Sequence, residues 1–476
     1  MRFILLLPFF LSLFFTPLSA SSTNGGYRIE VELQHFEGDT LFLGYYFGKA
    51  QYLKDTASLV KGKFVFEGDS TLAPGVYLLV IPPDNKFIHV IVTENEQRFS
   101  VSVDMDKIVP SARFKGSPEG DIYYEYLREL DKRRPAADSL RKLIASDSLH
   151  KSDHQVKLDK IDKEVLKVQD DVRSKHPASM TAMLIWANRD IVIPEYKEVA
   201  EEDRKQKQYE YYKAHYFDHI DFNDPRMMRS GMIHTKVDYY LQKLTYQLPD
   251  SQSVAMQYLL NKMIDNKEIF QYYLVYFLNE AVKSKKMGMD AIYVDLVDHY
   301  YAKGYATWME KEQLDKLIAQ AEVLRPILIN KIAPDLKLYK ESGEEVILHN
   351  IQSDYTVLFF WDPECGHCKK SVPSIINFYN AYKDKGVELL AICTKTGNGV
   401  SACWDTISHR GMDIWVNVSD PLMKSRYKTI YDVKTTPQIY ILDRNKKILV
   451  KKIAAEDLMA VMDEIIKSEE KKVIKE

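Results

Sequence analysis

The sequence W-D-P-E-C-G-H-C-K-K, residues 361–370, decides the fold of the C-terminal part of the chain. It follows the uncharged apolar run 356–361, which is typical of a strand buried on both faces. It precedes a run with helical spacing of apolar residues, which are Val372, Ile375, Ile376 and Tyr379. A strand, a C-x-x-C pair and a helix in this order predict a redox-active pair of cysteines, Cys365 and Cys368.

The spacing of the two cysteines has a physical reason. A cysteine at the cap of a helix places its sulfur beside free backbone N–H groups and the positive end of the helix dipole, which stabilise a thiolate. Cys368 stands one turn further along the same face, near enough to form a disulfide with Cys365. We therefore expect Cys365 to be the exposed attacking thiol and Cys368 to be the resolving thiol.

The surrounding sequence predicts an α/β layered domain. An apparent hairpin, 336–348, precedes the central strand, and an apolar strand, 387–392, follows the helix. The segment V-K-T-T-P, 433–437, leads into two strands and an amphipathic terminal helix. Strands and helices therefore alternate until the chain ends in two strands and a helix, as in a layered α/β domain.

Three segments, A-P-D-L at 333–336, F-W-x-x-x-C-x-x-C-K at 360–369 and T-T-P at 435–437, together resemble a thioredoxin-fold domain of the TlpA/ResA type, within the AhpC/TSA-redoxin superfamily. The resemblance implies thiol–disulfide exchange without a cofactor. It also implies that the Thr436–Pro437 bond is cis and that Thr436 offers its backbone to an extended substrate peptide. The residues expected to modulate the site or to contact substrate are Trp361, Gly366, His367, Thr436 and Pro437.

Two positions depart from the family pattern, and the dipeptide between the cysteines leaves the direction of reaction open. Phe359 stands where thioredoxins carry a buried acid, and Ser371 stands where TlpA/ResA-type proteins often carry Glu, so the proton acceptor for Cys368 is open. Gly366-His367 is the dipeptide found in protein disulfide isomerases, and a His there stabilises the thiolate and makes the couple more oxidising. The dipeptide favours oxidation or isomerisation, whereas the TlpA-like frame favours reduction.

Other uses of the four cysteines fit the sequence less well, and we predict no metal site. Zinc would need Cys393 and Cys403 as a second pair, but they are ten residues apart rather than three. An inert disulfide between Cys365 and Cys368 would gain little chain-entropy stabilisation. A peroxidase would carry Thr-x-x-Cys where this chain has C-x-x-C. Two interpretations of Cys393 and Cys403 stay open, a second disulfide and buried small apolar residues.

The N-terminal residues predict export. Residues 1–20 contain an Arg, an apolar run and a small-residue pattern ending at Ala20, which is typical of a cleaved secretory signal peptide. The apolar run is too short to span a bilayer comfortably. The first cysteine of the chain is Cys365, so we expect no lipoprotein anchor. We predict a periplasmic protein whose mature chain does not span the membrane.

The composition restricts the class of protein. The chain has 476 residues, which predicts two to four domains, and 46% of them are hydrophobic, which predicts folded cores. The net charge is −3, and neither sign of charge forms a long run. The electrostatic footprint of a nucleic-acid binder is therefore missing, and we expect no nucleic-acid partner.

Two regions precede the redox region, which we predict to span 333–476. Residues 24–115 carry apolar residues with a period of two and predict a small antiparallel β sandwich or barrel. Residues 120–330 show helical spacing interrupted by prolines and predict an all-α region. Both regions resemble the N-terminal β domain and the helical middle domain of unknown function that precede thioredoxin domains in Bacteroidota proteins.

Two features of the helical region have both a structural and a functional interpretation. On a helix, His215 and His219 would share one face, close to Asp218, but no third ligand is obvious, so ordinary histidines are favoured over a metal site. The tyrosines near residues 272–276 could line a cleft, but a stripe of core residues is favoured.

Together these observations predict an exported thiol–disulfide oxidoreductase that reduces disulfides in other exported proteins. The resemblance implies a membrane thiol carrier as its electron source. Two alternatives stay open. One is a disulfide oxidase or isomerase that uses Cys365 and Cys368 with the reverse electron flow. The other is an envelope binding or scaffold protein in which the first two regions carry the main function.

Overall fold

The computed structural model describes residues 25–83 and 86–473. The predicted signal peptide, residues 1–20, lies outside the described residues. The chain divides into two compact units, Met1–Lys236 and Val237–Glu476, so the helical region expected at 120–330 is shared between them. A helix with the length and apolarity needed to cross a membrane is absent from the part of the chain that the structure describes.

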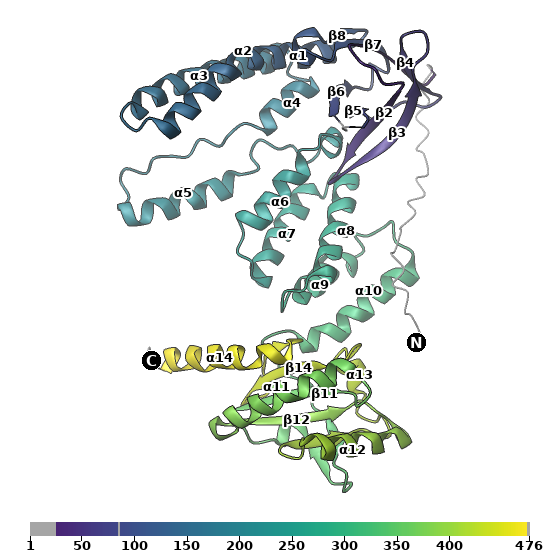
Figure 1. The fold of residues 1–476 in the computed structure, drawn as a ribbon, viewed down its shortest axis with the longest axis vertical. Helices are drawn as coiled ribbons and strands as arrows, with labels where there is room; N and C mark the ends of the chain where they lie inside the picture. Colours follow the sequence, from purple (N-terminus) through teal and green to yellow (C-terminus); the bar gives the residue numbers. More distant parts are fainter. Residues whose placement is uncertain (1–24, 84–85, 474–476) are drawn as a thin grey trace. The chain divides into compact units, whose positions relative to one another are not determined.

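Two four-stranded sheets form the N-terminal β region (Figure 1). Their strand orders are β4-β1-β7-β8 and β3-β2-β5-β6. Neighbouring strands are antiparallel except β1 and β7, which are parallel. The strands are β1 (Tyr27–Gln34), β2 (Thr40–Phe47), β3 (Ala50–Ser58), β4 (Phe64–Gly68), β5 (Gly75–Ile81), β6 (Lys86–Val92), β7 (Arg98–Asp104) and β8 (Arg113–Lys115).

Alternate residues of the two sheets share one core, as the period-two pattern predicts. Ile29 of β1, Leu43 of β2 and Phe66 of β4 are fully buried in the same cluster. The β3 and β8 strands were not predicted. The β3 sequence, A-Q-Y-L-K-D-T-A-S, forms an edge strand that is mostly exposed, so it has no buried face to impose an alternating pattern.

The helices of the first unit follow the β region. A long hairpin of α2 and α3 runs side by side in Figure 1. The expectation that prolines interrupt the helices of this region is wrong at Pro135, because α2 continues through it. An ion pair between Arg133 of α2 and Glu164 of α3 lies beside that position and helps hold the two helices together. The elements are α1 (Ile108–Ser111), α2 (Pro118–Ser146), α3 (Lys151–Lys175), α4 (Met180–Ala187), α5 (Glu201–His215) and a 3-10 turn (Pro225–Arg229).

The second unit begins with helices, and one of them, α8, carries an aromatic stripe. Tyr273 of α8 is fully buried, and the partly exposed Tyr272 and Tyr276 stack beside it with ring centroids 6.2 Å apart. The core interpretation of these tyrosines therefore holds for Tyr273. The helices are α6 (Ile233–Lys243), which crosses the boundary between the units, α7 (Pro249–Met263), α8 (Lys267–Lys283), α9 (Asp290–Leu296), a π-helical turn (Val297–Tyr301), α10 (Lys311–Leu324) and a 3-10 turn (Arg325–Ile327).

The C-terminal region is a seven-stranded mixed sheet with helices, which confirms the predicted α/β layered domain. Its strand order is β10-β9-β13-β12-β11-β14-β15. At its centre, β11 pairs in parallel with β12 and antiparallel with β14. The elements are β9 (Lys337–Tyr339), β10 (Glu345–Ile347), β11 (Tyr355–Trp361), α11 (Gly366–Tyr382), β12 (Val387–Cys393), α12 (Ser401–Arg410), β13 (Val416–Ser419), α13 (Tyr427–Ile430), β14 (Gln438–Asp443), β15 (Ile448–Lys451) and α14 (Leu458–Val473).

Both faces of β11 are buried, which explains its uninterrupted apolar sequence. Phe359 and Trp361 face a core that includes residues of α11, α12 and α14. Phe360 points the other way, and its ring lies 5.7 Å from the ring of Tyr427 and 5.4 Å from that of Tyr431. This packing fixes the end of β11, from which the chain turns into α11.

Candidate active site

Cys365 caps the N-terminus of α11, as the sequence predicts. Its Sγ accepts a hydrogen bond from the backbone N–H of Cys368 at 3.3 Å. The Cys365 side chain is partly exposed, whereas the Cys368 side chain is buried inside the first turn. Both are free thiols. The geometry therefore provides one accessible sulfur at the positive end of a helix and a second, covered sulfur behind it.

The loop before β14 meets Cys365. The thiol of Cys365 donates to the backbone carbonyl of Thr436 at 3.2 Å. The Thr436–Pro437 peptide is cis, which confirms the expectation drawn from the family resemblance. Two segments 71 residues apart in the sequence thus form one surface around the sulfur.

The two thiols differ in acidity. Burial alone would raise the pKa of Cys365, but hydrogen bonds from the Cys368 thiol, the Cys368 backbone and Thr436 outweigh it and lower that pKa. Burial raises the pKa of Cys368 to about 12. At neutral pH the Cys365 sulfur is therefore the better nucleophile of the two, and the Cys368 sulfur stays protonated.

The other predicted residues lie at different depths. Gly366 and His367 are exposed on the first turn of α11, so both can meet a substrate. Trp361 is only 1% exposed, and its backbone carbonyl accepts from the N–H of Thr394 at 2.8 Å. Its side chain packs in the core beneath the two cysteines and does not line the surface of the site. Phe359 is fully buried in the same core.

Sequence reasoning missed an ion cluster beside the cysteines. The Lys395 ammonium lies 2.6 Å from a Glu364 carboxylate oxygen and 3.4 Å from one of Asp362. The hydrogen bond with Glu364 is the main reason that the pKa of Lys395 is raised. The two acids stand inside the quoted stretch 361–370, but their partner follows β12 and could be found only from the fold.

Cys393 and Cys403 form a disulfide that links β12 to α12. Both sulfurs are buried, and Cys393 stands opposite Trp361 in the β11–β12 pairing. This answers the question that the sequence left open between a second disulfide and free buried thiols. It also removes the second pair that a zinc site would need.

His215 and His219 do not form one cluster. Since α5 ends at His215, His219 lies outside the helix and the two do not share a helix face. His215 pairs with Asp218 at 2.6 Å, whereas Nδ1 of His219 lies 3.0 Å from the carbonyl of Arg189. Each histidine therefore has a local structural partner.

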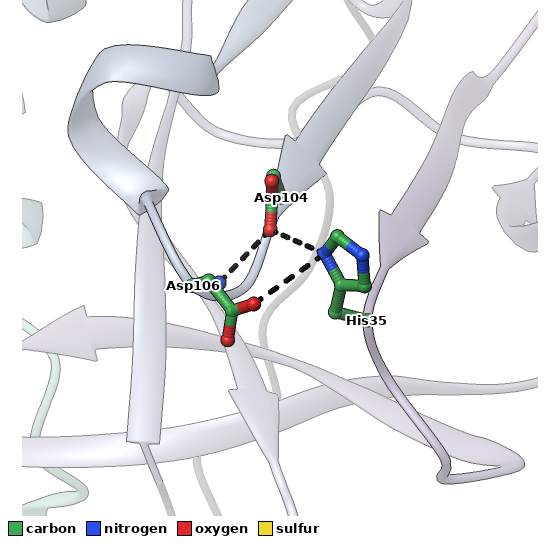
Figure 2. A group of neighbouring side chains, drawn as sticks. All are labelled: His35, Asp104 and Asp106. Atoms are coloured by element: carbon green, nitrogen blue, oxygen red, sulfur yellow. Dashed lines mark hydrogen bonds and ion pairs between the residues drawn. The ribbon is translucent and has the colours of Figure 1, made fainter.

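A different group of potential ligands lies in the β region. Figure 2 shows the His35 ring directed toward Asp104 and Asp106, with Nδ1 2.8 Å and 3.6 Å from their carboxylate oxygens. The hydrogen bond with Asp104 is the largest cause of the raised pKa of His35. His35 and Asp106 are exposed, and an ordinary surface ion pair accounts for the arrangement.

The first unit also contains a cavity of about 560 Å³. Three of its charged lining residues have partners within the fold: Arg226 binds Asp224 through two nitrogens, and Glu119 accepts hydrogen bonds from the first turn of α4. The other lining residues are Pro74, Thr93, Glu94, Asn95, Ala178, Asp221, Asn223, Pro225 and Arg229. No particular class of ligand is indicated by this lining.

Comparison with known families gives three matches that together cover most of the chain. Residues 329–451 match the AhpC/TSA family. Residues 27–123 and 159–325 match two domains of unknown function, DUF4369 and DUF5106. The order of the matches agrees with the resemblance stated from the sequence and confirms it.

Individual relatives are distant. The thiol-disulfide oxidoreductase ResA of Bacillus subtilis is 25% identical over 117 residues, which cover 25% of this chain and 63% of that protein. A thioredoxin-like protein of Haemophilus influenzae is 28% identical over 132 residues, covering 27% of this chain and 72% of that protein. The solved structure of a thioredoxin-like protein from Bacteroides caccae matches with 20% identity and a TM-score of 0.43, over 57% of this chain and 98% of that one.

Proposed function

Residues 329–451 form a thioredoxin-like domain of the AhpC/TSA family, of the type found in thiol–disulfide oxidoreductases, and from this premise we propose that the protein exchanges disulfides through Cys365 and Cys368. The observation that carries the proposal is the placement of Cys365. Its sulfur caps α11, has a lowered pKa, touches the carbonyl of Thr436 and has Cys368 directly behind it.

The reaction begins when the Cys365 thiolate attacks one sulfur of a substrate disulfide. A bond forms between Cys365 and that sulfur, the substrate S–S bond breaks, and the other substrate sulfur leaves as a thiolate that is then protonated. Cys368 gives up its proton and attacks Cys365, which releases the second substrate thiol. The substrate gains two electrons and two protons, and the protein retains a Cys365–Cys368 disulfide until a thiol donor reduces it.

Reduction of disulfides in exported proteins is the direction we propose first. Its support is the resemblance of the domain to TlpA/ResA-type proteins. Reduction requires a dithiol electron donor, and we propose a membrane thiol carrier as its source. The second candidate is oxidation or isomerisation. The lowered pKa of Cys365 and the neighbouring His367 favour it, because a stabilised thiolate stabilises the reduced form and makes the couple more oxidising.

Export to the periplasm is part of the proposal. Its support is the signal-peptide pattern of residues 1–20 and the buried disulfide between Cys393 and Cys403. Disulfides of this kind persist in oxidising compartments and are rare in the cytosol. A cytosolic location would therefore leave this bond unexplained.

Trapping of the mixed disulfide tests the proposed roles of the two cysteines. In a Cys368→Ser variant the resolving step is lost, so a disulfide-containing substrate protein should stay bound to Cys365 and be released by dithiothreitol. The matched control is Cys365→Ser, which keeps Cys368 but should trap nothing. Equal trapping by both variants, or none by either, would contradict the assignment.

A further inference from the structure

A buried carboxylate stands close to the loop that meets Cys365. Asp432 is only 6% exposed and lies five residues before Pro437, in a left-handed backbone conformation with φ of 49°. Its two oxygens each lie 3.0 Å from an ammonium group, one from Lys434 and the other from Lys452. Although burial opposes ionisation, these two cations lower the pKa of Asp432, so the group is a buried, fully paired carboxylate.

A residue of the helical region completes this cluster. Gln320, on α10, donates from its side-chain nitrogen to Asp432 at 3.4 Å. Its side-chain oxygen accepts from the Lys434 ammonium at 3.1 Å. One amide therefore contacts both members of the Asp432–Lys434 ion pair, with its donor toward the anion and its acceptor toward the cation. This is the arrangement that the charges favour.

The segment held in this way leads directly to the site. Val433 donates its backbone N–H to the carbonyl of Lys428, and Lys434 donates its own to the carbonyl of Asp432, which keeps the segment tightly turned. Two residues after Lys434, the carbonyl of Thr436 receives the Cys365 thiol. Only Thr435 separates Lys434 from Thr436 in the chain.

We infer that Gln320 is a positioning residue, through which the helical region holds the Asp432–Lys434 segment and so sets the place of Thr436 beside Cys365. The inference rests on the proposed function and deepens it. It gives α10 a role in binding the extended disulfide substrate, since Thr436 is where a peptide would lie. The chemistry of the Cys365 sulfur itself does not pass through Gln320.

Replacement of Gln320 by Ala in the full chain tests this role. With dithiothreitol as the reductant and a synthetic peptide containing one disulfide as substrate, KM should rise about fivefold, the effect expected from losing about 1 kcal/mol of hydrogen bonding. Neither kcat nor the single-turnover rate at which the reduced protein, freed of dithiothreitol, reacts with 5,5′-dithiobis(2-nitrobenzoate), which is too small to lie along Thr436, should change more than about twofold. The control is Gln313→Ala on the same helix, which should behave like the wild type.

Hydrogen exchange gives a readout that does not depend on turnover. The backbone amides of Val433 and Lys434 should exchange faster in the Gln320→Ala protein than in the wild type or the Gln313→Ala protein. Unchanged exchange at these amides would overturn the inference. So would an equal fall in kcat with the peptide and in the rate with 5,5′-dithiobis(2-nitrobenzoate). If the wild type reduces neither substrate, the proposed function fails, whereas the exchange result still decides whether Gln320 holds the segment.

Discussion

The two thiols of the site stand three residues apart in the sequence, yet their pKa values are shifted in opposite directions. Cys365 lies at a helix cap, where hydrogen bonds lower its pKa below that of an ordinary thiol, and Cys368 lies inside the first turn, where burial raises its pKa to about 12. Because only the thiolate reacts, alkylation reports this difference directly.

We expect iodoacetamide to modify Cys365 of the reduced protein at neutral pH and to leave Cys368 unmodified. Since the pKa of Cys365 is lowered, the midpoint of its alkylation rate against pH should lie below that of a free thiol. Mass spectrometry of peptides alkylated over a pH series measures this. Alkylation of the two cysteines in parallel, with a midpoint near that of a free thiol, would contradict the assignment.

His367 provides a second test at the scale of one residue. Its replacement by Ala should destabilise the Cys365 thiolate and hence the reduced form, which makes the reduction potential more negative. A change of about 30 mV corresponds to about 1.4 kcal/mol for a two-electron couple, and we expect a change of that order. His299→Ala, an exposed histidine of the helical region, is the control and should leave the potential unchanged. A shift to a less negative potential in His367→Ala would show that the imidazole does not stabilise the thiolate.

At the scale of elements, patterns that depend on near neighbours were predictable. The β11–turn–α11 unit, the capping role of Cys365 and the β strands with one buried face all follow from local spacing. Pro135 and β3 show where prediction from near neighbours fails. The proline lies within a helix whose partner, α3, is visible only in the fold, and β3 is an edge strand with little burial to shape its sequence.

The disulfide between Cys393 and Cys403 stabilises the connection between β12 and α12. It closes a loop of ten residues between β12 and α12, so replacing both Cys393 and Cys403 by Ala should destabilise the protein by about 2 to 3 kcal/mol. Disulfide exchange at Cys365 should continue. Thermal unfolding, followed together with activity, measures both. The control is the Cys365→Ser protein, in which only the partly exposed thiol is replaced, and it should keep its stability and lose its activity. Loss of exchange in the Cys393→Ala, Cys403→Ala protein would assign this bond a catalytic role.

At the scale of the second unit, the redox region is joined to the helices that precede it. Lys451 of β15 is 2% exposed, pairs with Asp290 of α9 and donates to the carbonyl of Ile327 at 2.7 Å. Asn330 donates its backbone N–H to Ile448 at 2.8 Å, which extends the edge of the sheet. A fragment beginning at residue 333 would lack all of these partners.

Loss of the Asp290 carboxylate should therefore be costly. An Asp290→Asn variant leaves the Lys451 charge buried without its counter-ion, and we expect a loss of about 3 kcal/mol in unfolding free energy. The control is Asp298→Asn, which breaks the exposed pair with Arg325 and should cost less than about 1 kcal/mol. Denaturant unfolding of both variants measures the difference. Equal stabilities would mean that Lys451 does not need this partner.

Contacts of this long range explain what the sequence alone could not reveal. Gln320 and Asp432 are 112 residues apart, and Asp290 and Lys451 are 161 apart. In each pair the residues have ordinary surface identities, and no local spacing signals that they meet. The cysteine pair was predictable because its partners are close in the sequence, whereas its supporting residues become visible only when the fold brings them together.

The reduction potential of Cys365 and Cys368 tests the central claim most directly. The full chain is equilibrated in glutathione buffers of graded potential, and free thiols are counted by mass spectrometry. We predict that Cys365 and Cys368 lose their thiols together in one two-electron transition near or below about −270 mV, while Cys393 and Cys403 stay bonded. A value near about −180 mV would favour oxidation or isomerisation over reduction. Failure of Cys365 and Cys368 to pair at any glutathione ratio would contradict the account.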